Sequence, residues 1–300
     1  MSGEEAMIIV PGPSSASLGR KMAEILEAKL VSVAFKKFPD GESYLRFEEE
    51  VAGEEVVVVQ STGPPQDTSL IQLLILIDAA KDLGAKRVTA VVPYLAYARQ
   101  DKRFLPGEAI SIQTVGKLLK AAGVDELLTV NVHEEKVLKN FGFPAESVSA
   151  MSLLAEYFKS KGFQGAFSLA PDRGAVQLAV EAAEVLGGEY GWLEKKRDLY
   201  TGEAKTEEKI LNVSGKDVII FDDIISTGGT VANAVKILKK QGARRVFAAC
   251  AHPLMIGNAK EKILQSGAEG IVGTDSVSSD VTVVSLAPLL AKVLAEKFKG

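Results

Sequence analysis

The residues best suited to chemistry lie in one short segment, FDDIISTGGT, which runs from Phe221 to Thr230. Two adjacent carboxylates, Asp222 and Asp223, follow the apolar run VIIF, and small residues follow them. Glycine, serine and threonine at the start of a helix expose backbone N–H groups that bind phosphate, and the helix dipole favours the negative charge. The segment therefore predicts a phosphate site directly beside two acids.

Two carboxylates would repel a phosphate unless the carboxylates bind something else. A ribose phosphate satisfies both groups, because its phosphate takes the N–H groups while its vicinal hydroxyls donate to the acids. The alternative is an ordinary helix cap, with Ser226 or Thr227 as the N-cap residue and the acids solvated. The two acids, the apolar spacer and the STGGT turn together favour the sugar phosphate.

Short apolar runs alternate with helical patterns along the whole chain, and these elements must position the acidic segment. VVVVQ at 56–60 precedes a helix expected at about 68–83, and DVIIFDD at 217–223 precedes the helical pattern TVANAVKILKKQG. Such alternation predicts mostly parallel sheets with helices on both faces. Ligands of these folds bind at the carboxyl ends of the strands, so we expect a strand to end at the two acids.

The sequence contains an internal repeat. KDLGAKRV at 81–88 resembles KKQGARRV at 239–246, and VVVVQSTGPPQDTSL resembles VIIFDDIISTGGTVA. The internal repeat predicts two similar α/β domains, 1–148 and 149–300, although any helix–glycine–strand joint can produce such a pattern by chance. Where the second half has Asp222 and Asp223, the first has Gln60 and Ser61, so only the second domain carries the acidic loop.

The composition narrows the class of protein. The chain has 300 residues, of which 47% are hydrophobic, and its net charge of −4 does not indicate a nucleic acid or a membrane surface as a partner. The most apolar stretch, LIQLLILIDAAKDLG, is too short and too polar to cross a bilayer. The single cysteine, Cys250, forms no intrachain disulfide, fits a cytoplasmic location and is expected to be a small core residue.

The acidic segment resembles the signature of the phosphoribosyl diphosphate-binding family, which contains the type I phosphoribosyltransferases and their relatives. Other segments resemble those of the ribose-phosphate pyrophosphokinases, or phosphoribosyl pyrophosphate synthetases, in that family's order over essentially the whole chain. These segments are FPDGE (38–42), YARQDKR (97–103), NVHEEK (131–136), APDRG (170–174), LEKKR (193–197) and AHPLMIG (251–257). The resemblance implies an α/β fold of two tandem type I phosphoribosyltransferase-like domains, each a mostly parallel sheet flanked by helices.

The resemblance also implies a reaction. The anomeric hydroxyl of ribose 5-phosphate would attack the β-phosphorus of Mg-ATP, giving 5-phosphoribosyl 1-diphosphate and AMP for nucleotide biosynthesis. Transfers of this kind depend mostly on positioning and charge neutralisation. The N-terminal domain would bind ATP, and the C-terminal domain would hold the ribose 5-phosphate loop and a flexible catalytic loop.

For the C-terminal domain, the resemblance assigns roles residue by residue. Asp222 and Asp223 would hold the ribose hydroxyls. The 5-phosphate would lie on the turn that follows, formed by Ser226, Thr227, Gly228, Gly229 and Thr230. Serine stands at 226 where many relatives carry an acid, so a changed affinity for the sugar phosphate is open.

The resemblance makes Lys195 and Arg197 the catalytic pair. They lie in GWLEKKRDLYTGEAKTEEK, and on this loop they would close over the reaction centre and stabilise the charge of the transferring group. Lys196 competes with Lys195 for the role, and the spacing to Arg197 favours Lys195. The other interpretation of this charged stretch is a solvated loop.

For ATP, the resemblance assigns two segments and a histidine. Phe38 would stack on the adenine, and Asp40 and Glu42 would accept from its amino group. The remaining ATP-binding residues would be Arg99, Gln100, Asp101 and His133. In the family the FPDGE hairpin comes from a neighbouring subunit, which implies a homo-oligomer with a shared active site. Without the resemblance, FPDGE would be a plain turn and the Arg-Gln-Asp segment a solvated loop.

The resemblance implies Mg²⁺, with His133 and Asp172 as its protein contacts. Mg²⁺ commonly takes one or two carboxylates together with substrate phosphates and water. The alternatives are a structural hydrogen bond for His133 and a helix N-cap for Asp172. His252, in AHP, matches the family but receives no role.

Two other functions share part of this pattern. A phosphoribosyltransferase that consumes the diphosphate would share the acidic loop but would not need YARQDK or FPDGE. A noncatalytic regulatory subunit would tend to lose the catalytic residues, whereas Lys195, Arg197 and both acids are present. FLPGEAIS after RQDKR is less basic than in many relatives, and the end of the chain, APLLAKVLAEKFKG, lacks their longer tail. Inhibition by ADP and the size of the oligomer therefore stay open.

Overall fold

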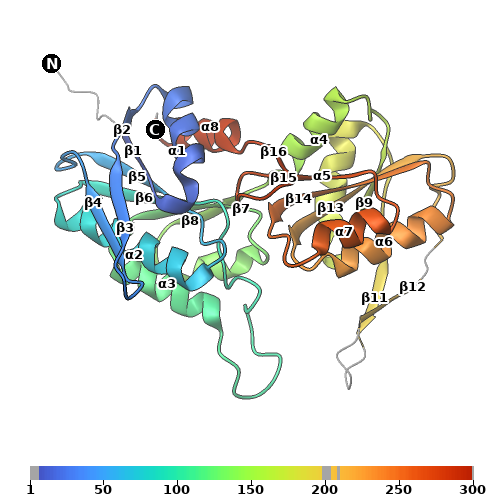
Figure 1. Cartoon of the computed structure of the whole chain (residues 1–300), viewed down its shortest axis with the longest axis horizontal. Helices are drawn as coiled ribbons and strands as arrows, with labels where there is room; N and C mark the ends of the chain where they lie inside the picture. The colour runs from blue at the N-terminus through green and yellow to red at the C-terminus, as the bar shows by residue number, and fades with distance from the viewer. Residues whose placement is uncertain (1–6, 198–203, 208–209, 299–300) are drawn as a thin grey trace. The chain divides into compact units, whose positions relative to one another are not determined.

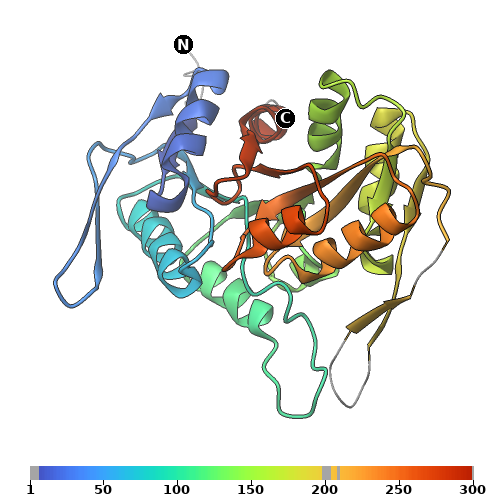
Figure 2. The ribbon, with the colours of Figure 1, turned by 45° about the vertical axis from the view of Figure 1, so that its right-hand side comes forward.

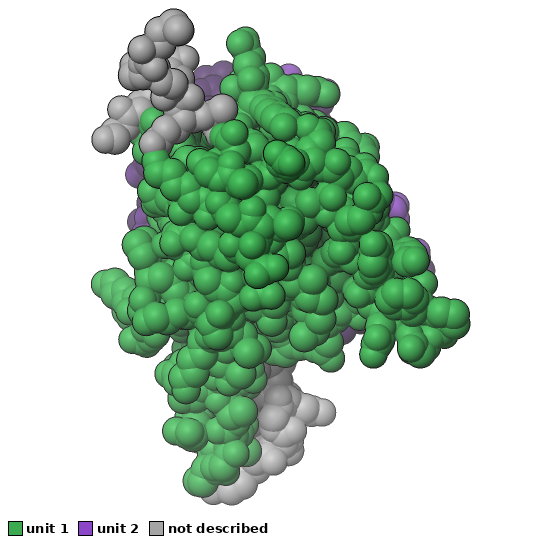
Figure 3. All heavy atoms as spheres, turned by 90° about the vertical axis from the view of Figure 1, so that its left-hand side faces the viewer, with its two compact units in different colours: residues 1–148, 285–300 green, residues 149–284 purple. Residues whose placement is uncertain are grey.

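The computed structural model describes residues 7–197, 204–207 and 210–298; within 195–207 it describes only backbone. The chain forms two compact units, residues 1–148 with 285–300 and residues 149–284 (Figure 1). In Figure 3 the atoms of the first unit form one continuous surface on the face shown. The fold class predicted from the sequence is confirmed, because each unit is a parallel sheet with flanking helices.

The first unit contains a parallel sheet in the order β2-β1-β5-β6-β7-β8. Its strands are β1 (Met7–Pro11), β2 (Lys29–Leu30), β5 (Glu55–Val59), β6 (Arg87–Val92), β7 (Glu126–Val130) and β8 (Ala145–Val148). Its helices are α1 (Ala16–Leu26), α2 (Gln66–Asp82), α3 (Ser111–Ala121) and α8 (Ala287–Phe298), with 3₁₀ turns η1 (Pro13–Ser15) and η2 (Glu135–Asn140). Every residue of β5 is buried, as expected for a strand covered on both faces.

The second unit contains a parallel sheet in the order β10-β9-β13-β14-β15-β16. Its strands are β9 (Phe167–Ala170), β10 (Tyr190–Trp192), β13 (Asp217–Ile225), β14 (Arg245–Pro253), β15 (Gly270–Thr274) and β16 (Thr282–Val284). Its helices are α4 (Met151–Ser160), α5 (Val176–Leu186), α6 (Gly229–Lys240) and α7 (Ala259–Gln265), with the 3₁₀ turn η3 (Arg173–Ala175).

The two sheets have the same topology, strand for strand. In each unit the second strand in the chain lies at the edge, and an antiparallel hairpin is inserted before the third strand of the sheet. The hairpin of the first unit is β3 (Val33–Lys37) with β4 (Ser43–Phe47), and that of the second is β11 (Glu194–Arg197) with β12 (Ala204–Glu207). Figure 2 shows β3–β4 projecting from its unit.

The internal repeat is also visible in backbone conformation and hydrogen bonding. Gly84 and Gly242 hold the same place after α2 and α6, with left-handed φ values of 87° and 84°. The carbonyl of each accepts a 2.8 Å hydrogen bond, from Gly53 N and Gly215 N respectively. Matching conformations and hydrogen bonds at matching positions show that the two segments are structurally equivalent, rather than alike by chance.

The end of the chain departs from the expected division at 148, because residues 285–300 belong to the first unit. Helix α8 lies beside α1 (Figures 1 and 2). Leu290 and Leu294 are fully buried, and Lys297 Nζ lies 2.5 Å from Glu126 Oε1 and 2.8 Å from Glu146 Oε2. Apolar burial and ion pairs therefore hold the last helix on the N-terminal unit, where chain order had placed it on the other.

Within the described ranges, no helix has the length and hydropathy needed to cross a membrane. The apolar stretch predicted as a buried helix forms most of α2. Leu73, Leu76 and Ile77 of α2 are fully buried, while Ile71 and Ile75 are exposed. Cys250 is fully buried in β14, which confirms its assignment to the core.

Candidate active site

The two acids do not end their strand, as the sequence had suggested. Strand β13 continues through Ile225, and Asp222 lies opposite Cys250 in β14. The prediction was wrong because β14 is equally long and supplies pairing partners as far as Pro253. Both acids are half-buried inside the sheet, where neighbouring strands fix their backbone positions.

The turn after the acids leads into α6 without a side-chain cap. The N-cap residue is Gly228, with a left-handed φ of 71°, so Ser226 and Thr227 are not the N-cap. A Cβ on Gly228 would meet the carbonyl oxygen of Ala259 at 3.0 Å, whereas one on Gly229 would meet nothing within 4 Å. Glycine is therefore required at 228 by conformation and space, and the backbone at 229 is open to an approaching ligand.

Asp172 lies two residues beyond β9, the strand that pairs with β13. Its Oδ1 accepts a 2.9 Å hydrogen bond from Gly174 N, so it caps the turn η3, as the simpler interpretation predicted. Burial raises the pKa of Asp222, and the nearby charges of Asp223 and Asp172 raise it further. Asp222 and Asp223 of β13 thus share one corner of the second unit with Asp172, which lies just beyond the adjacent strand β9.

This corner gathers negative charge. Hydroxyl donors or a cation would stabilise the charged form of Asp222, and either kind of partner fits the carboxylate oxygens. Among the described residues, no group of three or more histidine, cysteine, aspartate or glutamate side chains is arranged to hold a metal. Mg²⁺ commonly takes only one or two carboxylates together with substrate phosphates and water, and carboxylates are ligands of that kind.

The neighbouring thiol is not a candidate for chemistry. Burial raises the pKa of Cys250 far above its ordinary value, and the charge of Asp222 adds to this effect. A thiol that stays protonated is neither a nucleophile nor a metal ligand.

The predicted catalytic pair lies on β11. Lys195 pairs with Thr206 and Arg197 with Ala204 in the β11–β12 hairpin. Alternate residues of a strand share a face, so Lys195 and Arg197 lie on one face of the hairpin and Lys196 on the other. The side chains of all three lie outside what the structure describes.

The FPDGE segment forms the tip of the β3–β4 hairpin. Phe38 N donates to Glu42 O at 2.9 Å, and Asp40 Oδ1 accepts from Glu42 N at 3.1 Å, so the expected turn is present. The Phe38 ring is 40% exposed and meets Tyr44 edge-on at a centroid distance of 5.9 Å. The hairpin thus carries a partly exposed aromatic side chain at its tip, with Lys36 Nζ 5.1 Å from the centre of the Phe38 ring.

Arg99, Gln100 and Asp101 do not follow their strand directly, because β6 ends at Val92. They lie in a long loop in which Gln100 Nε2 donates to Lys102 O at 3.3 Å and Arg99 is exposed. Glu108 accepts from Phe104 N at 2.7 Å and from Leu105 N at 2.9 Å, which folds the outer part of this loop.

The two histidines differ in environment. His133 is exposed and lies in the loop beyond the end of β7 at Val130. Its loop leaves the same edge of the first sheet as the Arg99 loop, because β6 and β7 are parallel neighbours. His252 is 1% exposed, with Nδ1 2.9 Å from Ser276 Oγ, which is a structural role.

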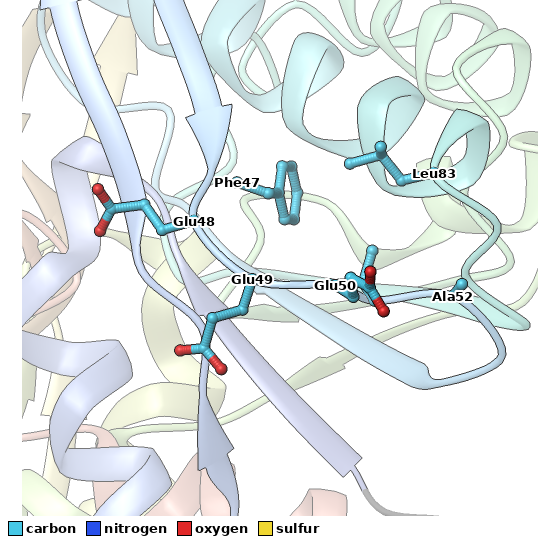
Figure 4. Close-up of a pocket in the computed structure, with 7 residues that line it drawn as sticks. Phe47, Glu48, Glu49, Glu50, Ala52 and Leu83 are labelled. Carbon is cyan, nitrogen blue, oxygen red and sulfur yellow. The ribbon is translucent and has the colours of Figure 1, made fainter.

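A cavity of about 580 Å³ lies at the base of β3–β4, and none of the described residues that line it is a predicted site residue. It is lined by Phe47, Glu48, Glu49, Glu50, Val51, Ala52 and Leu83. Figure 4 shows the carboxylates of Glu48 and Glu49 pointing away from Phe47 and Leu83. An acidic rim repels phosphates, so this cavity does not suit a phosphorylated substrate.

Two models of protein families match this chain. Residues 7–123 match the model of the N-terminal domain of ribose phosphate pyrophosphokinase, and residues 144–272 match that of the phosphoribosyl transferase domain. The ribose-phosphate pyrophosphokinase of Methanobrevibacter smithii is 45% identical, over 96% of this chain and 100% of that protein. That of Methanothermobacter thermautotrophicus is 44% identical, over the same shares.

A solved structure extends the likeness to the fold of the full chain. The phosphoribosylpyrophosphate synthetase of Mycobacterium smegmatis has a TM-score of 0.87 and is 32% identical, covering 98% of this chain and 99% of that one. These matches cover at least 96% of this chain and at least 99% of each of the three proteins. This chain belongs to the ribose-phosphate pyrophosphokinase family.

Proposed function

We propose that this chain is a ribose-phosphate pyrophosphokinase, which transfers the pyrophosphoryl group of ATP to the anomeric hydroxyl of ribose 5-phosphate. The observation that carries the proposal is the corner where Asp222 and Asp223 lie beside the uncapped, glycine-rich start of α6. Acids alone would repel a phosphate and an open helix start alone would attract any anion. Together they select a sugar that carries both hydroxyls and a phosphate.

In this proposal Asp222 and Asp223 accept hydrogen bonds from the ribose hydroxyls. The 5-phosphate binds backbone N–H groups at the start of α6 and the hydroxyls of the same turn. The residues concerned are Ser226, Thr227, Gly228, Gly229 and Thr230. Support comes from the open space over Gly229 and from the exposure of Thr227.

The adenine of ATP stacks on Phe38, with Asp40 and Glu42 accepting from its amino group. Asp40 Oδ1 already accepts from Glu42 N, which holds the turn and leaves a second carboxylate oxygen for such a contact. Arg99 makes a bidentate phosphate contact, helped by Gln100 and Asp101. His133 contributes from the neighbouring loop.

Lys195 and Arg197 stabilise the negative charge of the transferring group. Their shared face on β11 supports acting together, and it favours Lys195 over Lys196. Fixed cations at a transferring phosphoryl group are worth more in the transition state than in the bound substrate.

We further propose that the nucleotide binds as its Mg²⁺ complex, with Asp172 and His133 as protein contacts. Mg²⁺ would neutralise phosphate charge as the pyrophosphoryl group moves. The raised pKa of Asp222 beside Asp172 supports a cation in this corner, since negative charge gathers there.

The chain acts as a homo-oligomer, in which the hairpin of one copy completes the nucleotide site of another. The exposed aromatic tip of β3–β4 supports this arrangement. A cytoplasmic location fits a protein with one cysteine, which is buried and makes no disulfide. Ultracentrifugation of the diluted protein tests this arrangement. A monomer that is still active would contradict the shared site.

The test is phosphorus NMR of the purified protein with Mg²⁺, ATP and ribose 5-phosphate, against a control without the sugar. The proposal predicts sugar-dependent AMP and a new diphosphate ester at the anomeric carbon. Binding of the sugar diphosphate without AMP formation would instead indicate a phosphoribosyltransferase or a regulatory subunit. A panel of nucleobases would separate those two, because only the transferase would consume one.

A further inference from the structure

A buried chain of polar side chains runs from the first sheet to the β3–β4 hairpin. Gln60, at the carboxyl end of β5, is fully buried, and its Oε1 accepts from Ser14 N at 3.0 Å. Its Nε2 lies 3.3 Å from both Ser69 O and Gln72 Oε1. Gln72 Nε2 in turn donates to Ser43 Oγ at 3.1 Å. Three side chains thus connect β5, α2 and β4.

The donor and acceptor roles in these hydrogen bonds are fixed by the backbone partners of the Gln60 amide. A backbone N–H can only donate and a backbone carbonyl can only accept, so Ser14 N and Ser69 O set which end of the Gln60 amide is oxygen. Gln60 must therefore donate to Gln72, and Gln72 must accept with its Oε1. The NH₂ group of Gln72 is left facing Ser43. Each amide has one orientation that satisfies its partners.

The last link lies beside the hairpin tip. Ser43 is the first residue of β4 and pairs with Lys37, the last residue of β3. The next pair outward is Phe38 with Glu42, which closes the turn. The hairpin is a two-stranded sheet of its own, and the outer residues of β3 are exposed. A tip on such an isolated hairpin depends on contacts of this kind for its position.

We propose that Gln72 is a positioning residue for nucleotide binding: through Ser43 it holds the hairpin tip where Phe38 meets the base. Gln72 is 5% exposed, so it does not contact the nucleotide itself. The proposal rests on the nucleotide role proposed above for the hairpin. It also gives a use to Gln60, which stands in the first unit where the second carries Asp222.

The test uses Gln72→Met, which keeps the length of the side chain and removes both hydrogen bonds, and Ser43→Ala, which removes only the last one. Ser43→Thr keeps a hydroxyl and should behave as wild type. Ser32→Ala is the matched control, because Ser32 lies at the base of the same hairpin and its hydroxyl makes no hydrogen bond among the described residues.

Two readouts are measured on the full chain. Losing one hydrogen bond of ordinary net strength predicts a rise of about 3- to 10-fold in the KM for ATP, with the KM for ribose 5-phosphate unchanged. Hydrogen exchange at the amides of Phe38 and Gly41, which donate within the turn, should speed up by a similar factor. Both effects should appear in Gln72→Met and Ser43→Ala but not in the control.

The outcomes separate this proposal from the proposed function. Faster exchange with an unchanged KM for ATP would overturn the positioning role, as would unchanged exchange in both variants. Equal rises in both KM values would indicate general loosening and would also overturn it. A wild-type protein that forms no AMP would refute the proposed function, and hydrogen exchange alone would then decide whether Gln72 holds the tip.

Discussion

The carboxyl end of β5 and the segment of β13 that carries the two acids hold the same place in two copies of one fold, and they differ in their side chains. In the backbone register, Glu55 lies opposite Arg87 at the start of β5, and Asp217 lies opposite Arg245 at the start of β13. Counting from these pairs places Gln60 where the second unit has Asp222. The first site is closed by hydrogen bonds between its own side chains, whereas the second carries two half-buried acids and a helix start without a side-chain cap.

The contrast shows that the same sheet order carries different side chains at equivalent positions. A Cβ on Gly12 would lie 2.3 Å from Gln60 Oε1, so the amide of Gln60 occupies the space beside the first strand. Ser61 N donates to Ser15 Oγ at 2.8 Å, and Thr62 Oγ1 accepts from Ala96 N at 2.7 Å. The first strand end is therefore closed by its own side chains.

The two hairpins extend the comparison, because they are inserted at the same point of the two sheets. In the proposed function the first carries an aromatic tip for the base, and the second carries cations for the transferring group. Each unit thus contributes its hairpin, but only one contributes a sugar site.

The largest effect is expected at the second hairpin. Lys195→Ala should lower kcat by about 10²- to 10³-fold, the range for removing one group that stabilises transition-state charge. The KM for ATP should change little. Steady-state kinetics measure both, and Lys196→Ala, on the other face of β11, is the control. Near-normal turnover in Lys195→Ala would remove its catalytic role.

The next effect compares the strand ends directly. Asp223→Ala should weaken ribose 5-phosphate binding by about 10- to 100-fold, because hydrogen bonds to a charged group are worth about 1.5–3 kcal/mol. Ser61→Ala, at the equivalent position of the first unit, should leave that affinity unchanged. Calorimetric titration checks both variants. Unchanged sugar affinity in Asp223→Ala would refute its assignment.

A smaller effect is expected at the first hairpin. Phe38→Ala should raise the KM for ATP by about tenfold, in keeping with about 1–3 kcal/mol for stacking a base on an aromatic ring. Phe35→Ala is a matched control on the same hairpin, since Phe35 is 41% exposed and Phe38 40%. Equal effects of the two substitutions would argue against a specific stacking role.

The smallest effect concerns the other ends of the strands. Hydrogen bonds from Arg244 and Arg245 hold the pKa of Asp217 well below its ordinary value. Their stabilisation is therefore present above the ordinary pKa of about 4 and is lost as the pH falls below it.

Asp217→Asn should accordingly lower the free energy of unfolding at neutral pH by about 1–2 kcal/mol, since both arginines are partly exposed. The difference from wild type should shrink as the pH falls from 4 toward 2. Urea titrations at several pH values measure it. A difference that grows on acidification would show that the sign is wrong.

Much of this fold follows from sequence, because β-branched runs and helical periods are local signals. The internal repeat around Gly84 and Gly242 also indicated the duplication. Strand length did not follow: β13 extends past its acids only because β14 is there to pair with it. Nor did the place of α8, which depends on contacts with residues far away in the chain, such as Glu126.

The candidate site shows the same limit. The acidic segment could be found because its residues are adjacent, and the family resemblance supplied the distant ones. The Gln60–Gln72–Ser43 connection could not be found, because its members lie on three elements and no local pattern joins them. A polar residue inside an apolar helix, such as Gln72 in LIQLLILID, was the only sequence signal for it.

The most direct measurement is the stoichiometry of ribose 5-phosphate binding by calorimetry, on wild type and on a variant with both Asp222→Ala and Asp223→Ala. We expect one sugar-phosphate site per chain, with binding lost in the double variant. Two sites per chain, or undiminished binding in the double variant, would contradict the assignment of the sugar to the second strand end.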